Sequence, residues 1–392
     1  MTLSPLSSTM CERLVARSRI CICCKLDSIR TGVLVRSFSL LARRLSRRCL
    51  IRRSSLAAVL PFAGPLRSIA AQDQAATPAV PTSSLGWSDS FDDDDNGKLN
   101  VATTVAPISS IVRNVGGTRI DIHGVVPDGT NSHTFEPAPS DAILLSKADL
   151  VIVNGLDLED PTIELAEANL KEGAEIYSLG DKTIAPEEYA YDFSFPKEEG
   201  HPNPHLWPNV PFAMKYAELV AAKLVERDQP NADYYRQNLD RYQAVLHGLD
   251  EAILIAVQTI PEGQRKLLTY HDSWAYFAQH TGMTVIGAAQ PSDFSEPSPK
   301  EVAALIDQIK AEQVPAVFGS EVFPSAVLEQ IANEAGAVYV DGLRDDDPPG
   351  QPGDPEHTYL GMMLNNMRLM IPALGGNVDA LAGIAPWDTY AP

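Results

Sequence analysis

The chain has 392 residues, of which 44% are hydrophobic and 21% charged, values ordinary for a soluble globular protein. Residues 1–71 hold 13 of the 31 Lys and Arg and two of the 51 Asp and Glu, so residues 72–392 carry a formal charge of −31. This charge argues against a nucleic-acid or anionic-membrane partner and is compatible with attraction of cations. All five cysteines also lie within residues 1–71, which excludes a disulfide framework and a thiolate metal site from the remainder.

Residues 1–71 have the features of an export leader. The segment Ser46–Arg52 is similar to the twin-arginine export signal. An apolar stretch from Leu56 to Leu66 follows, too short and too interrupted by proline to span a bilayer, and then small residues suited to signal peptidase. We therefore predict export to the periplasm or cell surface; the alternative is a misassigned start codon. Residues 72–97 are Pro/Ser-rich and then acidic, which predicts a flexible linker.

Short apolar strands and helical stretches alternate after the linker, which is typical of a parallel α/β lobe. The predicted strands are Leu99–Val105, Arg119–Val126, Asp149–Asn154 and Glu175–Leu179. The predicted helices are Ile108–Val115, Ser140–Lys147, Asp160–Leu170 and Val210–Arg227. Residues 180–208 contain several prolines and acids without a clear period, so we expect a loop there.

A long amphipathic helix is predicted next. Apolar residues from Tyr235 to Ile260 recur at alternating spacings of four and three, which places them on one helix face. Asp228 or Asn231 can cap its start, and Pro261 ends it. At 1.5 Å per residue the helix is about 45 Å long. This length indicates a stiff connection between two lobes.

The second lobe repeats the order of elements. Its predicted strands are Lys266–Tyr270, Thr284–Ala288, Ala316–Phe318 and Ala337–Val340. Its predicted helices are Ser273–His280, Pro299–Glu312, Pro324–Glu334 and Leu360–Ile371. The fold class is thus α/β, with two lobes that each contain a four-stranded parallel sheet flanked by helices, joined by one long rigid helix. The predicted divisions are a leader (1–71), a linker (72–97), an N-terminal lobe (98–229), the linking helix (230–260) and a C-terminal lobe (261–392).

Three of the eight histidines have a distinctive local setting. His133 lies in Ser-His-Thr-Phe-Glu-Pro, His205 in Asn-Pro-His-Leu-Trp-Pro, and His271 in Tyr-His-Asp-Ser-Trp-Ala-Tyr-Phe. Each follows a predicted strand or lies in a loop. Taken singly, each is best explained as a structural histidine. Parallel sheets bind ligands in the crevice outside their strand C-termini, where two such lobes would face each other.

Together these segments resemble the metal-binding solute-binding proteins of zinc and manganese ABC importers. His133–Pro137 matches the family's His-Thr-aromatic-Glu-Pro segment, and His271–Phe277 its His-Asp segment. Asn203–Trp207 matches the family's Asp-Pro-His-aliphatic-Trp segment, with Asn in place of Asp. Further matches are Asn154–Leu156, Glu296–Ser298, Glu321 and Tyr359–Met363. The resemblance covers residues 98–375.

The resemblance implies two lobes joined by one long helix and a metal site between them. The metal ligands it implies are His133, His205, His271 and Asp341. Three imidazoles and one carboxylate suit tetrahedral Zn²⁺. In this family a histidine at the third position is typical of zinc and a glutamate of manganese, so His271 favours Zn²⁺; Mn²⁺ remains the alternative. The family's His-rich loop is absent, since residues 181–204 contain only His201. Glu136, Asp272 and Glu321 are candidates to orient the ligands.

The resemblance implies a non-enzymatic carrier that captures Zn²⁺ outside the membrane. The carrier would deliver the ion to an ABC-type membrane permease with its cytoplasmic ATPase, and we expect it to be a monomer. Two alternatives stay open. One is the same carrier used for Mn²⁺, or an adhesin-like surface role. The other is a zinc-dependent hydrolase, which needs an open coordination position and a nearby base.

Overall fold

The computed structural model describes residues 91, 96–322 and 325–392. All of them belong to one compact unit, residues 74–392. The predicted leader, with its twin-arginine segment, lies outside the described residues, as does most of the predicted linker. Phe91, Asn96 and Gly97 are the described residues of the linker, and the ring of Phe91 is buried and packs with Ala102, Val151 and neighbouring apolar residues. The folded part of the chain therefore includes a residue ahead of the predicted start at Lys98.

The first sheet is parallel and has the order β2-β1-β3-β4. Its strands are β1 (Leu99–Thr103), β2 (Ile120–Gly124), β3 (Leu150–Val153) and β4 (Glu175–Ser178). The helices of this half are α1 (Ala106–Gly116), α2 (Pro139–Lys147), α3 (Asp160–Asn169) and α4 (Val210–Arg227). Short 3-10 turns break the segment between β4 and α4. This segment is irregular, as its proline content predicts.

The second sheet is also parallel and has the order β6-β5-β7-β8. Its strands are β5 (Lys266–Thr269), β6 (Thr284–Ala288), β7 (Ala316–Ser320) and β8 (Val338–Leu343). The helices of this half are α6 (Ala275–Thr281), α7 (Pro299–Glu312), α8 (Ala326–Ala335) and α9 (Tyr359–Ala373). The register between β7 and β8 shifts between Phe318 and Ser320, so β8 runs on beyond the predicted end at Val340.

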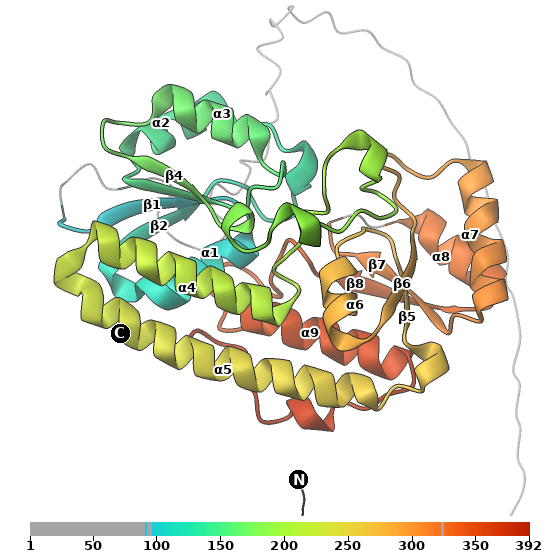
Figure 1. Cartoon of the computed structure of the whole chain (residues 1–392). Coiled ribbons are helices and arrows are strands. Elements are labelled where there is room, and N and C mark those ends of the chain that lie inside the picture. Colours follow the sequence, from blue (N-terminus) through green and yellow to red (C-terminus); the bar gives the residue numbers. More distant parts are fainter. Residues whose placement is uncertain (1–90, 92–95, 323–324) are drawn as a thin grey trace, which may run out of the picture. The chain divides into compact units, whose positions relative to one another are not determined.

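Helix α5 (Ala232–Gln258) connects the two halves. It runs alongside α1 and α4 of the first half and α6 and α9 of the second (Figure 1). One face of α5 is buried, including Tyr235, Tyr242 and Leu246. A single hydrophobic cluster contains these side chains together with Val101 of the first sheet and Phe318 of the second. Because both halves share this core, α5 is a packed structural element rather than an exposed tether.

The chain returns to the first half at its end. The side chain of Asn114 in α1 donates to the Asp388 carboxylate at 2.9 Å and accepts the backbone N–H of Thr389 at 2.8 Å. Arg113 forms an ion pair with Asp388 at 2.9 Å, and the Tyr234 hydroxyl of α5 donates to the carbonyl of Ala391. The last residues therefore bond to α1 and α5, although they belong to the predicted C-terminal lobe (261–392).

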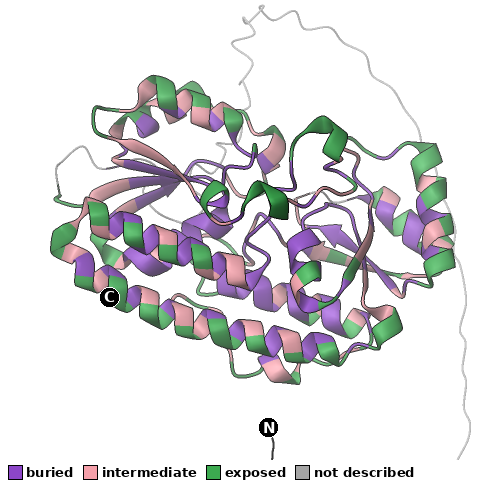
Figure 2. Cartoon of the chain, viewed as in Figure 1, coloured by how far each residue is buried: buried purple, intermediate pink, exposed green. Residues whose placement is uncertain are grey.

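Burial follows the layers of the fold. The central strands β1, β3, β5 and β7 are largely buried, while α5 alternates between buried and exposed positions (Figure 2). The predicted fold class, two parallel four-stranded sheets joined by a long helix, is confirmed. Within the described ranges, none of the helices combines the length and the apolar character that crossing a membrane requires.

The buried face of α5 gives a direct test of the shared core. Leu246 is fully buried, whereas Ile255 on the same helix is 61% exposed. Truncating Leu246→Ala leaves a cavity between packed elements, so we expect a loss of about 2–5 kcal/mol in the free energy of unfolding. Ile255→Ala is the matched control and is expected to change it by less than about 0.5 kcal/mol. Denaturant titration of the metal-free protein measures both, and equal effects would contradict the packing described for α5.

Candidate metal centre

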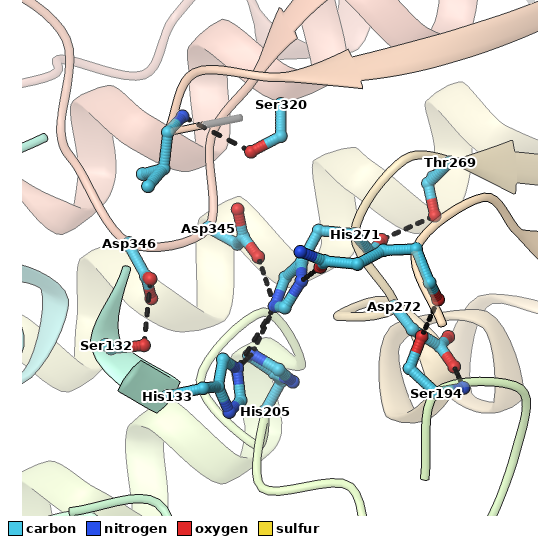
Figure 3. Close-up of polar contacts among 12 residues, drawn as sticks. Ser132, His133, Ser194, His205, Thr269, His271, Asp272, Ser320, Asp345 and Asp346 are labelled. Carbon is cyan, nitrogen blue, oxygen red and sulfur yellow. Dashed lines mark hydrogen bonds and ion pairs between the residues drawn. The ribbon is translucent and has the colours of Figure 1, made fainter. Parts of the chain in front are cut away.

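Three imidazole rings converge between the two sheets. Nε2 of His133 lies 3.1 Å from Nε2 of His205 and 3.2 Å from Nε2 of His271 (Figure 3). The Nε2 atoms of His205 and His271 are 3.0 Å apart. Tetrahedral Zn–N bonds of about 2.0–2.1 Å place two ligand nitrogens about 3.3 Å apart. The three nitrogens are therefore spaced much as they would be around one such ion. Among the described residues, this is the one group of His, Asp and Glu side chains whose ligand atoms cluster so closely.

Each histidine comes from a separate segment. His133 lies in a 3-10 turn (Ser132–Thr134) between β2 and α2, where Asn131 accepts its backbone N–H at 2.9 Å. His205 lies in the irregular segment ahead of α4, and His271 is the second residue after β5 ends. The site thus draws two rings from the first half of the chain and one from the second. His205 and His271 are almost completely buried, and His133 is partly buried.

The far nitrogens of two rings are held by amide side chains. Nδ1 of His205 lies 2.8 Å from Oδ1 of Asn203, and Nδ1 of His271 lies 2.6 Å from Oε1 of Gln290. The Asn203 oxygen also accepts the backbone N–H of His205, while its nitrogen donates to the Asp272 carbonyl, which fixes the orientation of the amide. Because an amide oxygen only accepts, both rings carry their proton on Nδ1. Both Nε2 lone pairs consequently face the centre.

The cluster favours uncharged rings at His133 and His205. Burial, and then the charge of the neighbouring His271, lowers the pKa of His133 well below its usual value. Burial, and then the charges of His271 and His133, lower the pKa of His205 well below its usual value. Neutral imidazole is the form that binds a metal, so little proton competition opposes a cation at neutral pH.

A buried carboxylate lies beside the three rings. Oδ2 of Asp345 lies 3.5 Å from Nε2 of His271, and the Asp345 side chain is 4% exposed. Among the described residues this oxygen has no hydrogen-bond donor. A buried carboxylate oxygen without a donor, directed at an imidazole nitrogen, is costly unless a cation lies beside it. The residues present therefore fit an N₃O metal site, with two members from each half.

Asp341, predicted as the fourth member, does not join this group. It is exposed within β8 and accepts a hydrogen bond from the Tyr339 hydroxyl at 3.1 Å. Asp341 was predicted from the family resemblance, beside a strand predicted to end at Val340. Because the register shift carries β8 on to Leu343, the second residue after the strand is Asp345, the position that His271 holds after β5. The run of three aspartates at 345–347 was the sequence feature that could have drawn attention to Asp345.

The three carboxylates predicted to orient the ligands have other contacts. Glu136 is exposed. Asp272 accepts the backbone N–H of Ser194 at 2.9 Å and so holds the segment that precedes His205. Oε1 of Glu321 accepts the backbone N–H groups of Asp345, Asp346 and Asp347 at 2.9–3.2 Å, which fixes the loop that carries Asp345. The residues that contact the imidazoles, Asn203 and Gln290, are amides rather than acids.

A left-handed turn after β3 supports the segment of His205. The Asn154 side chain donates to the carbonyl of Pro204 at 3.0 Å and accepts from the Tyr216 hydroxyl at 2.6 Å. The buried Glu159 carboxylate accepts the backbone N–H groups of Asn154 and Gly155. Gly155 has φ 79°, and a Cβ there would overlap the Ser178 hydroxyl, so glycine is required.

The other described histidines are not members of the cluster. His201 pairs with Asp157 at 2.9 Å, His280 with Asp250 at 2.7 Å, and His357 with Asp128 at 3.4 Å. His247 lies on the exposed surface of α5, as its helical setting predicts. His123 is buried in β2 with its ring 6.2 Å from that of Phe91.

The sequence profile of one protein family, described as "Zinc-uptake complex component A periplasmic", matches residues 101–373. The chain belongs to this family. The match contains His133, His205, His271 and Asp345, and all of both sheets except the first two residues of β1.

Individual relatives agree with this membership. The chain is 29% identical over 302 residues to the manganese-binding lipoprotein MntA of Halalkalibacterium halodurans, which covers 76% of this chain and 95% of the relative. It is 26% identical over 280 residues to the manganese ABC transporter substrate-binding lipoprotein PsaA of Streptococcus pneumoniae, covering 69% and 87%. Among solved structures, the periplasmic zinc binding protein TroA of Treponema pallidum is 27% identical, with a TM-score of 0.64 over 71% of this chain and 99% of that one.

The family defines the general role of the chain. It is an extracytoplasmic, metal-binding substrate-binding component of an ABC transporter, and it is not an enzyme. The predicted family, fold and general role are thus confirmed. The relatives are named for manganese as well as zinc, so membership alone leaves the choice of metal open.

The two aspartates give a matched test of the fourth ligand. Asp345→Asn removes the buried charge next to His271, so we expect metal affinity to fall by at least about 10-fold. Asp341→Asn alters an exposed carboxylate in the same strand–loop region and is expected to leave the affinity unchanged. Competition with a chelating dye, at fixed pH, measures both. A loss of affinity in the Asp341 variant alone would restore the original assignment.

Proposed function

We propose that this protein captures Zn²⁺ between its two lobes and delivers it to a membrane permease driven by a cytoplasmic ATPase. The proposed ligands are His133, His205, His271 and Asp345. The observation that carries the proposal is the approach of three imidazole Nε2 atoms to within 3.0–3.2 Å of one another. A site with three imidazoles and one carboxylate has the donor set and coordination number that zinc prefers.

The net negative charge of the chain and the burial of the site support a cationic cargo. Residues 72–392 carry a formal charge of −31. Such a net charge raises the local concentration of divalent cations and speeds their association. The burial of His205, His271 and Asp345 excludes water from the ion, which strengthens each interaction with it. These features fit a carrier that holds its cargo tightly until it reaches its partner.

Four protein ligands also separate this site from that of a zinc hydrolase. A catalytic zinc needs a coordination position open to water and a base close to it. In the proposed site Asp345 occupies the fourth position. The protein would therefore bind the ion without activating a water molecule, which suits transport.

Transport of Mn²⁺ is the second candidate, because two of the relatives described above are named for manganese. Manganese prefers carboxylate and water ligands and a higher coordination number, whereas imidazole suits zinc. A site with three imidazoles therefore favours zinc. Affinity alone does not decide the question, since most sites bind Zn²⁺ more tightly than Mn²⁺.

The test is the metal content of the protein purified from its native envelope without added metal. We expect about one zinc ion per chain, because the site has one complete ligand set. One manganese ion would contradict the choice of zinc, and absence of both metals would contradict the carrier. The variant His271→Glu, produced in the same way, replaces an imidazole by a carboxylate and is expected to shift the bound metal towards manganese. Size-exclusion chromatography of the same sample tests the proposed monomer.

A further inference from the structure

Two phenylalanine rings from different halves of the chain cover the imidazoles. Phe294, in the loop between β6 and α7, stacks on His133 with ring centroids 4.5 Å apart and planes inclined by 17°. Phe195, from the segment ahead of α4, lies 5.6 Å from His133 and 5.7 Å from His205. The two phenyl rings are themselves 6.1 Å apart. An apolar cover therefore lies directly against the ligand rings.

The backbone of Phe294 has an unusual conformation. Its φ is 56°, in the left-handed region that bulky residues rarely adopt. The turn is held by the Phe294 N–H, which donates to the Pro291 carbonyl at 3.0 Å. The side-chain nitrogen of Gln290 donates to the Phe294 carbonyl at 3.4 Å. The side-chain oxygen of the same residue contacts Nδ1 of His271. Such conformations persist where neighbours enforce them and often belong to binding sites with two states.

A cavity lies beside the stacked ring. Its volume is about 180 Å³. A cavity of about 150 Å³ accepts a benzene molecule, so this one can accept the phenyl group of Phe294. The cavity is lined by residues that include His133, Phe195, Phe294, Asp157, Glu199 and His201. The side chains of His201 and Asp157 are 64% and 47% exposed, so the cavity opens to solvent.

The segments that carry the two rings are fastened to each other. The Ser194 hydroxyl donates to the Gln290 carbonyl at 2.6 Å, and the Ser292 hydroxyl donates to the Glu199 carboxylate at 2.9 Å. These bonds hold the cover in place without fixing the phenyl ring of Phe294. The shared core and α5 join the two halves, so separation of the lobes would disrupt many packed side chains. Rotation of the Phe294 side chain would expose the site with a much smaller structural change.

We propose that Phe294 is a gating residue: stacked on His133 it blocks the path of the ion, and turned into the neighbouring cavity it opens that path. The proposal rests on the proposed function, since it concerns exchange of the same ion. It assigns to Phe294 control of the rates of entry and exit, while the ligands set the affinity. Removal of the ring should therefore speed both rates in similar proportion.

The test is stopped-flow kinetics on Zn²⁺-loaded protein mixed with excess EDTA, together with the rate of Zn²⁺ uptake by the metal-free protein. For Phe294→Ala we expect release and uptake to be at least about 10-fold faster, with a change of less than about 3-fold in Kd, because a gate alters both rates equally. Phe294→Tyr keeps the ring and is expected to stay within about 2-fold of the unmodified protein in both rates.

Phe193→Ala is the matched control, since Phe193 is two residues from Phe195 but 48% exposed. It should leave both rates unchanged. Unchanged rates in Phe294→Ala would overturn the gate, as would a weaker Kd with an unchanged rate of uptake, which indicates positioning of His133 alone. A protein that binds no zinc before any substitution contradicts the proposed function instead, so the two failures are distinguishable.

Discussion

The metal centre depends on one feature, the close approach of the Nε2 atoms of His133, His205 and His271. Nε2 of His205 and Nε2 of His271 are 3.0 Å apart, yet both rings keep their proton on the opposite nitrogen, where Asn203 and Gln290 accept it. Neither ring can donate to the other, so their approach is unfavourable until a cation lies between them. The buried Asp345 carboxylate adds a negative charge to the same point. One divalent ion bound between these nitrogens and the carboxylate would therefore stabilise all of them.

The scaffold makes this arrangement possible by limiting the freedom of its two halves. A hydrophobic cluster continues from the first sheet through α5 to the second, and the C-terminal residues bond back to α1. Direct contacts between the halves reinforce the site, because Ser132, next to His133, donates to the Asp346 carboxylate at 2.9 Å (Figure 3). Ligands from distant segments therefore meet in a geometry that the fold has already set, which lowers the entropy lost on binding.

Much of this could be predicted from the sequence, because periodicity and motifs are local. Alternating apolar runs gave both parallel sheets, and spacings of three and four gave α5. The histidines were found from short segments that resemble a known family. The position of Asp345 beside His271 was missed because the end of β8 depends on a register shift against β7, which no local pattern encodes. Gln290 and Phe294 were missed for a related reason, since their contacts with His271 and His133 exist only once the loops have folded together.

Anomalous diffraction at the zinc absorption edge, from crystals of the zinc-loaded protein, tests the central claim most directly. The account predicts one strong peak within about 2.0–2.2 Å of the three Nε2 atoms and of an Asp345 oxygen. A peak elsewhere in the molecule, or one that Asp345 does not approach, would contradict it.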